Sequence, residues 1–248
     1  MKACANLGTM FADLPMDERF GAARSAGFQG VEIPFPYDHP VPTILDRLAQ
    51  NDLSFVMLTC PPPNYTGAER GFAAVPGQEA RFRTDFKRTC RYAKALGCQH
   101  IHVMAGAVRG PDARACFLAN LRWALAEAPQ QSLTIEPMCQ EDVPGYYLND
   151  IGKAADIVRE IGNPQLGLQF DVHHVHQIHG DVAAQWAAVA DLVTHIQLSQ
   201  SPMRAAPDQR GDVDIAGFLK VVKSSGYRGW ISGEYLAAPT DKGHLFWV

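Results

Sequence analysis

The chain alternates between two hydrophobic periods along its length. Apolar residues at every second position predict short strands, and apolar residues that recur every three or four positions predict amphipathic helices. Strands are expected at residues 3–8, 27–35, 53–58, 99–106, 132–137, 166–171, 192–199 and 227–235. Helices are expected between them, at residues 16–26, 41–51, 78–96, 111–128, 149–161, 181–190 and 213–225.

This alternation predicts a parallel sheet whose strands are joined by right-handed helical crossovers. Eight such units in 248 residues match the size of a (β/α)8 TIM barrel, so this α/β chain is expected to form one domain over residues 1–248. An open doubly wound sheet is the alternative, but no glycine-rich phosphate loop follows the first strand. The segment after Glu234 is too short and broken for an eighth helix, and we expect an irregular C-terminal tail there.

Composition narrows the functional classes. The formal net charge is −4 and the pI is about 6.1, so the overall charge does not favour nucleic acid or an anionic membrane as a partner. No apolar run of about 18 residues exists, and the N-terminus lacks the apolar core of a signal peptide. The six cysteines contain no C-x-x-C pair, which indicates reduced thiols in a cytoplasmic protein and argues against a cysteine-ligated zinc site. Phe246 and Trp247 suggest a docked tail or a subunit contact in a homo-oligomer.

The segment LGLQFDVHHVHQIHGD, residues 166–181, holds the first candidate site. Its strand is expected to end at Asp171 and to break into a histidine-rich run, with the next helix beginning after Gly180. The run contains four histidines, His173, His174, His176 and His179. A carboxylate between a buried strand and several imidazoles indicates a metal or acid/base site. The alternative is a capped helix start with solvated histidines.

The same alternation places polar residues of other strands toward the barrel axis. They are Asn6, Glu32, His102, Glu136, Asp171, His195, Gln197 and Glu234. Several buried carboxylates without partners would cost several kcal/mol each, and a divalent cation offsets that cost. Four of the residues, Glu136, Asp171, Gln197 and Glu234, lie near the C-terminal ends of successive strands. Three carboxylates and one amide oxygen suit Mg²⁺ or Mn²⁺ better than zinc.

Four of these residues also have a simpler interpretation. Glu136 precedes a proline and could be a strand-end carboxylate in solvent. Gln197 could satisfy backbone groups, as most buried glutamines do. Glu32 and His102 could either support a site or be satisfied residues of the core.

The sequence resembles the hydroxypyruvate isomerase family of xylose isomerase-like TIM barrels. The resemblance covers most of the chain and rests on several segments together. They are ANLGTMF near the N-terminus, GVEIPFPYD (30–38), TGAERGFAAVPGQEARFR (66–83), EPM…DVPGYYLN (136–149), LQFDVHHVHQIHGD (168–181), HIQLSQSP (195–202) and GWISGEY (229–235).

The resemblance implies roles for the inward-facing residues. Those matching Glu136, Asp171, Gln197 and Glu234 hold the divalent metal in the family, and the two glutamates carry the proton transfers. The residue matching His174 lies at the substrate.

The chain also departs from the family pattern. It has Cys139 where Asn is usual and His173 where Tyr is usual. After the seventh strand it reads MRAAPD, which keeps Arg204 but lacks the His and Glu that usually follow. Leu236 stands where a basic residue is common.

The expected function is a metal-dependent isomerase that interconverts hydroxypyruvate and tartronate semialdehyde, or a close small 2-oxo acid, by proton transfer through an enediolate. Glu136 is expected as the base and Glu234 as its partner, with Mg²⁺ or Mn²⁺ as the cofactor. His174 would bind a substrate oxygen, and Arg204 would bind the substrate carboxylate. Glu32 and His102 are further candidates for the substrate site.

Other functions stay open. The substrate could be 2-oxotetronate or a small ketose, or the reaction could be an epimerisation. An endonuclease IV-like phosphodiesterase would use the histidines for zinc, but the acidic charge argues against it. An inactive sugar-binding barrel would fit the missing His and Glu after Arg204, but the intact set of metal ligands argues against it.

Overall fold

The computed structural model describes residues 1–61, 70–236 and 246–247. Its described residues contain nine strands, which are β1 (Lys2–Asn6), β2 (Gly30–Glu32), β3 (Ser54–Phe55), β4 (Met57–Cys60), β5 (His100–Val103), β6 (Ser132–Ile135), β7 (Leu166–Asp171), β8 (Val193–Leu198) and β9 (Trp230–Gly233). The helices are α1 (Met16–Ala26), α2 (Val41–Asn51), α3 (Glu79–Leu96), α4 (Asp112–Glu127), α5 (Ile151–Ile161), α6 (Val172–His179), α7 (Val182–Val189) and α8 (Ile215–Ser224).

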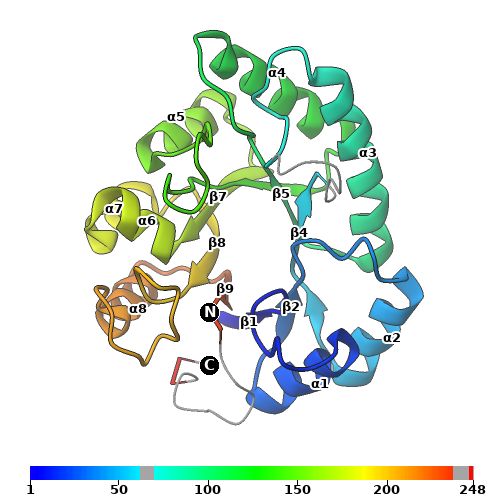
Figure 1. Ribbon diagram of the computed structural model, residues 1–248, viewed down its shortest axis with the longest axis vertical. Helices are drawn as coiled ribbons and strands as arrows, with labels where there is room; N and C mark the ends of the chain where they lie inside the picture. Colours follow the sequence, from blue (N-terminus) through cyan, green and yellow to red (C-terminus); the bar gives the residue numbers. More distant parts are fainter. Residues whose placement is uncertain (62–69, 237–245, 248) are drawn as a thin grey trace.

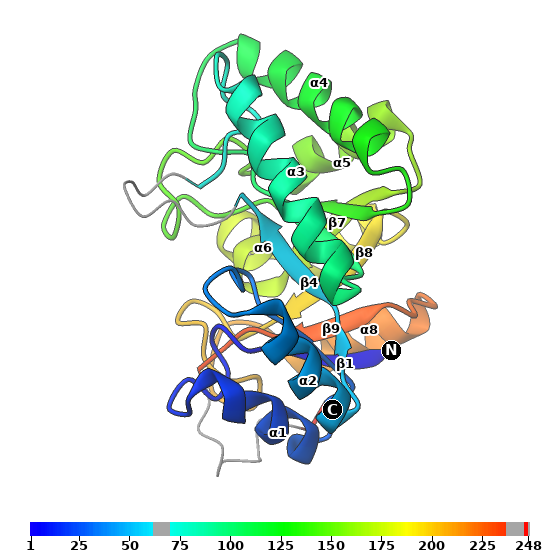
Figure 2. The same cartoon turned by 90° about the vertical axis from the view of Figure 1, so that its right-hand side faces the viewer.

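The strands form an inner ring with the helices outside it (Figure 1). Neighbouring strands are parallel, in the order β3-β2-β1-β9-β8-β7-β6-β5-β4. The two ends of this order, β3 and β4, are halves of one predicted strand, so the ring closes through Val56 between them. In Figure 2, α1 and α2 lie on the opposite side of the strands from α4 and α5. The predicted (β/α)8 barrel is confirmed.

Several predicted boundaries need correction. The strand expected at residues 53–58 is split because β3 pairs with β2 while β4 pairs with β5. The strand expected at 27–35 is reduced to β2, since Pro34 has no N–H with which to continue the ladder. The helices expected at 16–26 and 41–51 match α1 and α2 residue for residue.

The largest local correction concerns the histidine run. It is not a break but the helix α6, and the Asp171 carboxylate accepts the backbone N–H of His174 at 3.1 Å as its N-cap. The alternative interpretation of residues 171–179 as a capped helix start is therefore correct for the backbone. The histidines in its first turn are not solvated, however, because His173 and His174 are 1% and 4% exposed.

An aromatic cluster holds the outer face of β7. The Phe170 ring lies 5.4 Å from the Trp186 ring of α7 and 5.7 Å from the Phe218 ring of α8. Because Phe170 points outward from the barrel, the next residue, Asp171, points inward. This packing therefore fixes the direction of a candidate site residue.

The predicted irregular tail falls mostly on residues 237–245 and 248, outside the described residues. Trp247 packs against Phe28 with 5.6 Å between the ring centroids, as the docked-tail interpretation expects. None of the helices in the described part of the chain is long and apolar enough to cross a membrane.

We expect Phe170→Ala to lower the free energy of unfolding by about 3–5 kcal/mol, because it leaves a cavity in a fully buried cluster. Urea titration followed by circular dichroism measures the change. Leu45→Ala at a 40% exposed position of α2 is the control and should cost less than about 1 kcal/mol. Equal losses in the two variants would contradict the structural role of the cluster.

Candidate functional site

Three acidic side chains gather at the C-terminal ends of the strands. Glu136 directly follows β6, Asp171 ends β7, and Glu234 directly follows β9. Glu136 and Asp171 are 3% and 1% exposed, and the Glu234 side chain is 20% exposed. This is the end of a TIM barrel at which its active sites lie.

Arg204 is the cation that contacts this acidic group. Its Nη1 lies 3.0 Å from Asp171 Oδ2 and 3.6 Å from Glu234 Oε2, and its Nε lies 3.2 Å from Asp142 Oδ2. Its Nη2 lies 2.8 Å from His174 Nε2. The guanidinium is therefore engaged with protein groups here, rather than held toward a substrate carboxylate.

A chain of buried amides lies below the carboxylates. Gln169 Nε2 donates to Glu136 Oε2 at 2.8 Å and to Gln197 Oε1 at 2.7 Å. Gln197 Nε2 donates to Glu32 Oε1 at 2.9 Å. The structure thus brings Gln197 next to the candidate ligands, but its amide oxygen accepts from Gln169 instead of facing Asp171 or Glu234. Gln169 itself was not among the residues singled out from the sequence, although its strand position points inward.

Glu32 and His102 have different surroundings. Glu32 is fully buried. Its carboxylate accepts a hydrogen bond from Asn6 Nδ2 at 2.9 Å and lies 2.7 Å from His195 Nε2. These contacts match the interpretation of a satisfied core residue. His102 lines the cavity described below, and its Nδ1 lies 3.4 Å from Glu136 Oε2. Burial, reinforced by His174 and His195, lowers the pKa of His102 to about 3, so the ring is neutral near neutral pH.

The clustered carboxylates change each other's pKa. Burial and the neighbouring charges of Asp171 and Glu234 raise the pKa of Glu136 well above its usual value. Burial also raises the pKa of Glu234, with Arg204 opposing the rise and Asp171 adding to it. Burial alone would raise the pKa of Asp171, but Arg204 and the nearby histidines hold it below its usual value. The protein alone therefore leaves excess negative charge at this site.

The donor set fits a divalent cation. Single ligand atoms of Glu136, Asp171 and His174 lie within 4.8 Å of one another, and Glu234 shares Arg204 with Asp171. Carboxylate oxygens are the ligands that Mg²⁺ and Mn²⁺ prefer. A divalent ion would also offset the charge that raises the two glutamate pKa values.

A cavity of about 310 Å³ borders this group. Its polar lining includes Asn6, Thr59, Arg70, His102, Glu136, Gln169, Gln197 and Glu234. Its apolar lining includes Met16, Ile33, Phe35, Met57, Met104 and Met138. Arg70 was not singled out from the sequence, although it lies in a motif of the family resemblance and in the long connection at residues 59–77. The cavity combines acidic groups, a cation and an apolar wall, as small-molecule sites do.

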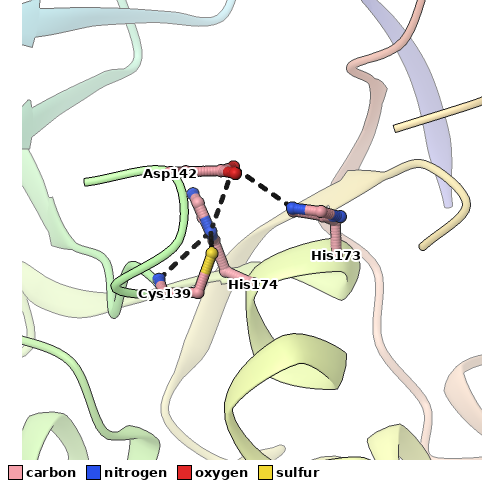
Figure 3. Close-up of side chains that lie close together, drawn as sticks. All are labelled: Cys139, Asp142, His173 and His174. Carbon is pink, nitrogen blue, oxygen red and sulfur yellow. Dashed lines mark hydrogen bonds and ion pairs between the residues drawn. The ribbon is translucent and has the colours of Figure 1, made fainter. Parts of the chain in front are cut away.

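A second polar group adjoins the first. Cys139, Asp142, His173 and His174 point toward one another between the segment after β6 and the start of α6 (Figure 3). Its cysteine and aspartate were also not predicted as site residues, because residues 139 and 142 lie beyond the end of β6, where strand phase no longer applies. Cys139 was noted only as a departure from the family.

Residues 20–245 match the family model described as a xylose isomerase-like TIM barrel. The chain is 37% identical to the 2-oxo-tetronate isomerase of Cupriavidus necator, covering 98% of this chain and 96% of that protein. It is 30% identical to the hydroxypyruvate isomerase of Escherichia coli, covering 100% and 98%. A crystal structure described as an AP endonuclease, family 2, from Brucella melitensis superposes with a TM-score of 0.92 at 33% identity, covering 99% and 97%.

We expect Glu136→Gln to flatten the pH dependence of stability in metal-free protein. The folded-state pKa of Glu136 is raised, so the wild-type residue contributes stability below its unfolded-state pKa of about 4.3 and loses that contribution as pH rises through the folded-state pKa. Glutamine does not titrate and avoids this loss. Unfolding free energies measured in chelator over the acidic to neutral range test the expectation.

The matched control for this measurement is Glu141→Gln, because Glu141 is exposed and lies in the same segment after β6. It should leave the wild-type pH profile unchanged. Added Mg²⁺ should stabilise the wild type more than Glu136→Gln. A steeper loss of stability with rising pH in Glu136→Gln would contradict the assigned direction of the pKa shift.

Proposed function

Because the chain belongs to the family of xylose isomerase-like TIM barrels, and isomerases of small 2-oxo acids match it over nearly its whole length, we propose that it is itself such an isomerase. The proposed reaction interconverts hydroxypyruvate and tartronate semialdehyde. The observation that carries the proposal is the pair of buried Glu136 and half-buried Glu234, both with raised pKa values, at the wall of one small cavity.

The cavity suits a small, charged substrate. Its volume of about 310 Å³ lies at the lower end of the range of about 300–1,000 Å³ for small-molecule sites. Glutamates line one part of the wall and Arg70 another. A three- or four-carbon oxo acid could therefore place its carboxylate at a cation and its reacting carbons at the carboxylates.

The two glutamates supply the proton chemistry. Glu136 takes the proton from C3 of hydroxypyruvate and returns it to C2 as a general base. Glu234 moves a proton between the two substrate oxygens. One proton leaves C3 and one arrives at C2, so the reaction needs no redox partner.

A divalent cation completes the proposed site. Glu136, Asp171 and Glu234 would hold Mg²⁺ or Mn²⁺, and Gln197 would join them when its amide oxygen turns from Gln169 to the cation. When bound, the cation would stabilise the negative charge that develops on the substrate oxygens. His174 offers Nε2 on the side of Glu136, where it can bind a substrate oxygen.

Arg70 is the better candidate for the substrate carboxylate. The guanidinium of Arg204 already contacts the carboxylates of Asp142, Asp171 and Glu234. Arg70 lines the cavity, and a guanidinium binds a carboxylate through paired hydrogen bonds. We therefore assign substrate recognition to Arg70 and charge balance among the protein carboxylates to Arg204.

The second candidate substrate is 2-oxotetronate. The Cupriavidus necator isomerase of that compound is 37% identical to this chain, and the cavity has room for one further carbon with its hydroxyl. A phosphodiesterase fits less well despite the likeness to the Brucella melitensis structure. The net charge of −4 and the acidic cluster would both repel a phosphate backbone.

We expect metal-dependent deuterium uptake when hydroxypyruvate is incubated with the enzyme in D₂O. Proton NMR should show exchange at C3 together with formation of the aldehyde, and chelation should stop both. Glu136→Gln should lower the rate by at least about 1,000-fold, because it removes the proton acceptor. Parallel reactions with 2-oxotetronate rank the two substrates.

The control in this experiment is again Glu141→Gln, which should exchange at the wild-type rate. Wild-type exchange in Glu136→Gln would remove this residue as the base. Absence of exchange with both oxo acids, in protein shown to bind Mn²⁺, would refute the proposed reaction.

We expect Arg70→Met to raise the KM for hydroxypyruvate by about 10–100-fold with a smaller effect on kcat, because a hydrogen bond to a charged group is worth about 1.5–3 kcal/mol. Steady-state kinetics measure the split. Deuterium exchange into dihydroxyacetone, which has no carboxylate, should change little. Arg109→Met, at an exposed arginine, is the control. An unchanged KM in Arg70→Met would show that another residue binds the substrate carboxylate.

A further inference from the structure

The group made of Cys139, Asp142, His173 and His174 offers one ligand atom from each residue, and these atoms all lie within 4.8 Å of one another. Cys139 Sγ is 3.2 Å from His174 Nδ1, and His174 Nδ1 is 3.8 Å from Asp142 Oδ2. Asp142 Oδ2 is also 3.1 Å from His173 Nε2. Figure 3 shows Asp142 between His173 and His174, with Cys139 beside His174.

These separations are close to the edge lengths of a tetrahedral metal site. With Zn–N bonds of about 2.0–2.1 Å and a Zn–S bond of about 2.3 Å, neighbouring ligand atoms in a tetrahedron are about 3.3–3.6 Å apart. The distances of 3.2, 3.8 and 3.1 Å for three of the six ligand pairs lie within a few tenths of an ångström of this range, and the other three pairs lie within 4.8 Å. Binding of an ion would therefore require side-chain adjustments that bring the ligand atoms to tetrahedral separations.

This donor set favours a different metal ion than the neighbouring carboxylate group does. A thiolate and two imidazoles favour zinc over magnesium or manganese, which prefer oxygen ligands. One thiolate and one carboxylate also balance the charge of a divalent ion, with the thiol proton released on binding. We propose that Cys139, Asp142, His173 and His174 form a second metal site, selective for zinc, beside the carboxylate site.

The two segments that carry the ligands are held firmly. Cys139 is fully buried, and its backbone N–H contacts His174 Nδ1 at 3.3 Å. The two histidines lie in the first turn of α6, which Asp171 caps. Because the site uses one cysteine and joins segments about 30 residues apart, the absence of a C-x-x-C pair does not argue against it.

The proposed site shares His174 with the carboxylate group. His174 Nε2 lies 2.8 Å from Arg204 Nη2 and 3.9 Å from Glu136 Oε1, whereas Nδ1 faces Cys139 and Asp142. Zinc on Nδ1 would leave the ring hydrogen on Nε2, which then cannot accept from Arg204. If the proposed isomerase function holds, zinc at this site should inhibit, because it changes the hydrogen-bonding role of His174 next to the base.

The test uses Co²⁺ as a spectroscopic substitute for zinc, with excess Mg²⁺ present to occupy the carboxylate site. Wild-type protein should show thiolate-to-cobalt charge-transfer absorption in the near ultraviolet and intense visible bands of tetrahedral cobalt. Zinc should displace these bands with a stoichiometry of one ion per chain. No substrate is needed, so the result is independent of the proposed reaction.

Two variants carry the residues usual in the family, Cys139→Asn and His173→Tyr. The first should abolish the charge-transfer band, and the second should remove the tetrahedral visible bands. Each should weaken zinc binding by at least about 100-fold in a chelator competition, because even the outer partners of a metal contribute about 10–100-fold. Circular dichroism establishes that each variant is folded.

Two controls distinguish zinc at this site from zinc at a different thiol or at the carboxylates. Cys90→Ser removes a thiol on α3 and should keep the full spectrum. Glu234→Gln alters the carboxylate site and should also keep it. Absence of a thiolate band in wild-type protein would overturn the proposal, as would an unchanged band in Cys139→Asn. Zinc inhibition that persists in folded Cys139→Asn would show that zinc acts at the carboxylate site instead.

Discussion

The arrangement of this protein depends on three acidic side chains, two of them buried and one half-buried, that lie close to the guanidinium of Arg204. Asp171 and Glu234 share Arg204 Nη1, and Glu136 lies on the other side of the group, bonded to Gln169. Buried carboxylates are costly unless they are paired, so every element that carries one of them must hold it against repulsion from the others. The closed strand ring, the aromatic cluster behind β7 and the amide chain beneath the carboxylates all serve that requirement.

Asp171 connects the helix α6 to the acidic group, because its two carboxylate oxygens make different hydrogen bonds. Oδ1 accepts the N–H of His174 and begins α6, while Oδ2 accepts from Arg204. One side chain therefore fixes the start of the helix that carries His173 and His174 and also sets the position of the guanidinium. His174 extends the connection, since one ring nitrogen faces Glu136 and Arg204 and the other faces Cys139 and Asp142. A ligand that binds one ring nitrogen of His174 must therefore change the hydrogen bonding at the other ring nitrogen.

The barrel and the inward direction of its polar residues could be predicted from the sequence, because strand periodicity is a local property. Asn6, His195 and Gln197 all contact Glu32, in agreement with the inward direction that strand phase predicts for the four residues. The orientation of the Gln197 amide could not be predicted, since it depends on a hydrogen bond from Gln169 on the neighbouring strand β7. The helix α6 was missed because a side-chain cap outweighed the weak helix propensity of histidine. Arg70, Cys139 and Asp142 lie in connections, where no periodicity indicates direction.

The charges also support our proposal that Arg204 balances the protein's own carboxylates and that a different residue binds the substrate carboxylate. Without a cation, the three carboxylates exceed the guanidinium by two negative charges, and the raised pKa values of Glu136 and Glu234 express that excess. A divalent cation would make the sum neutral and would therefore oppose the rise in the pKa values of both glutamates. A substrate that drew Arg204 away would restore the excess charge and protonate the base that the reaction needs. Recognition of an anionic substrate is therefore better placed at a separate cation, and Arg70 lies in the wall of the same cavity.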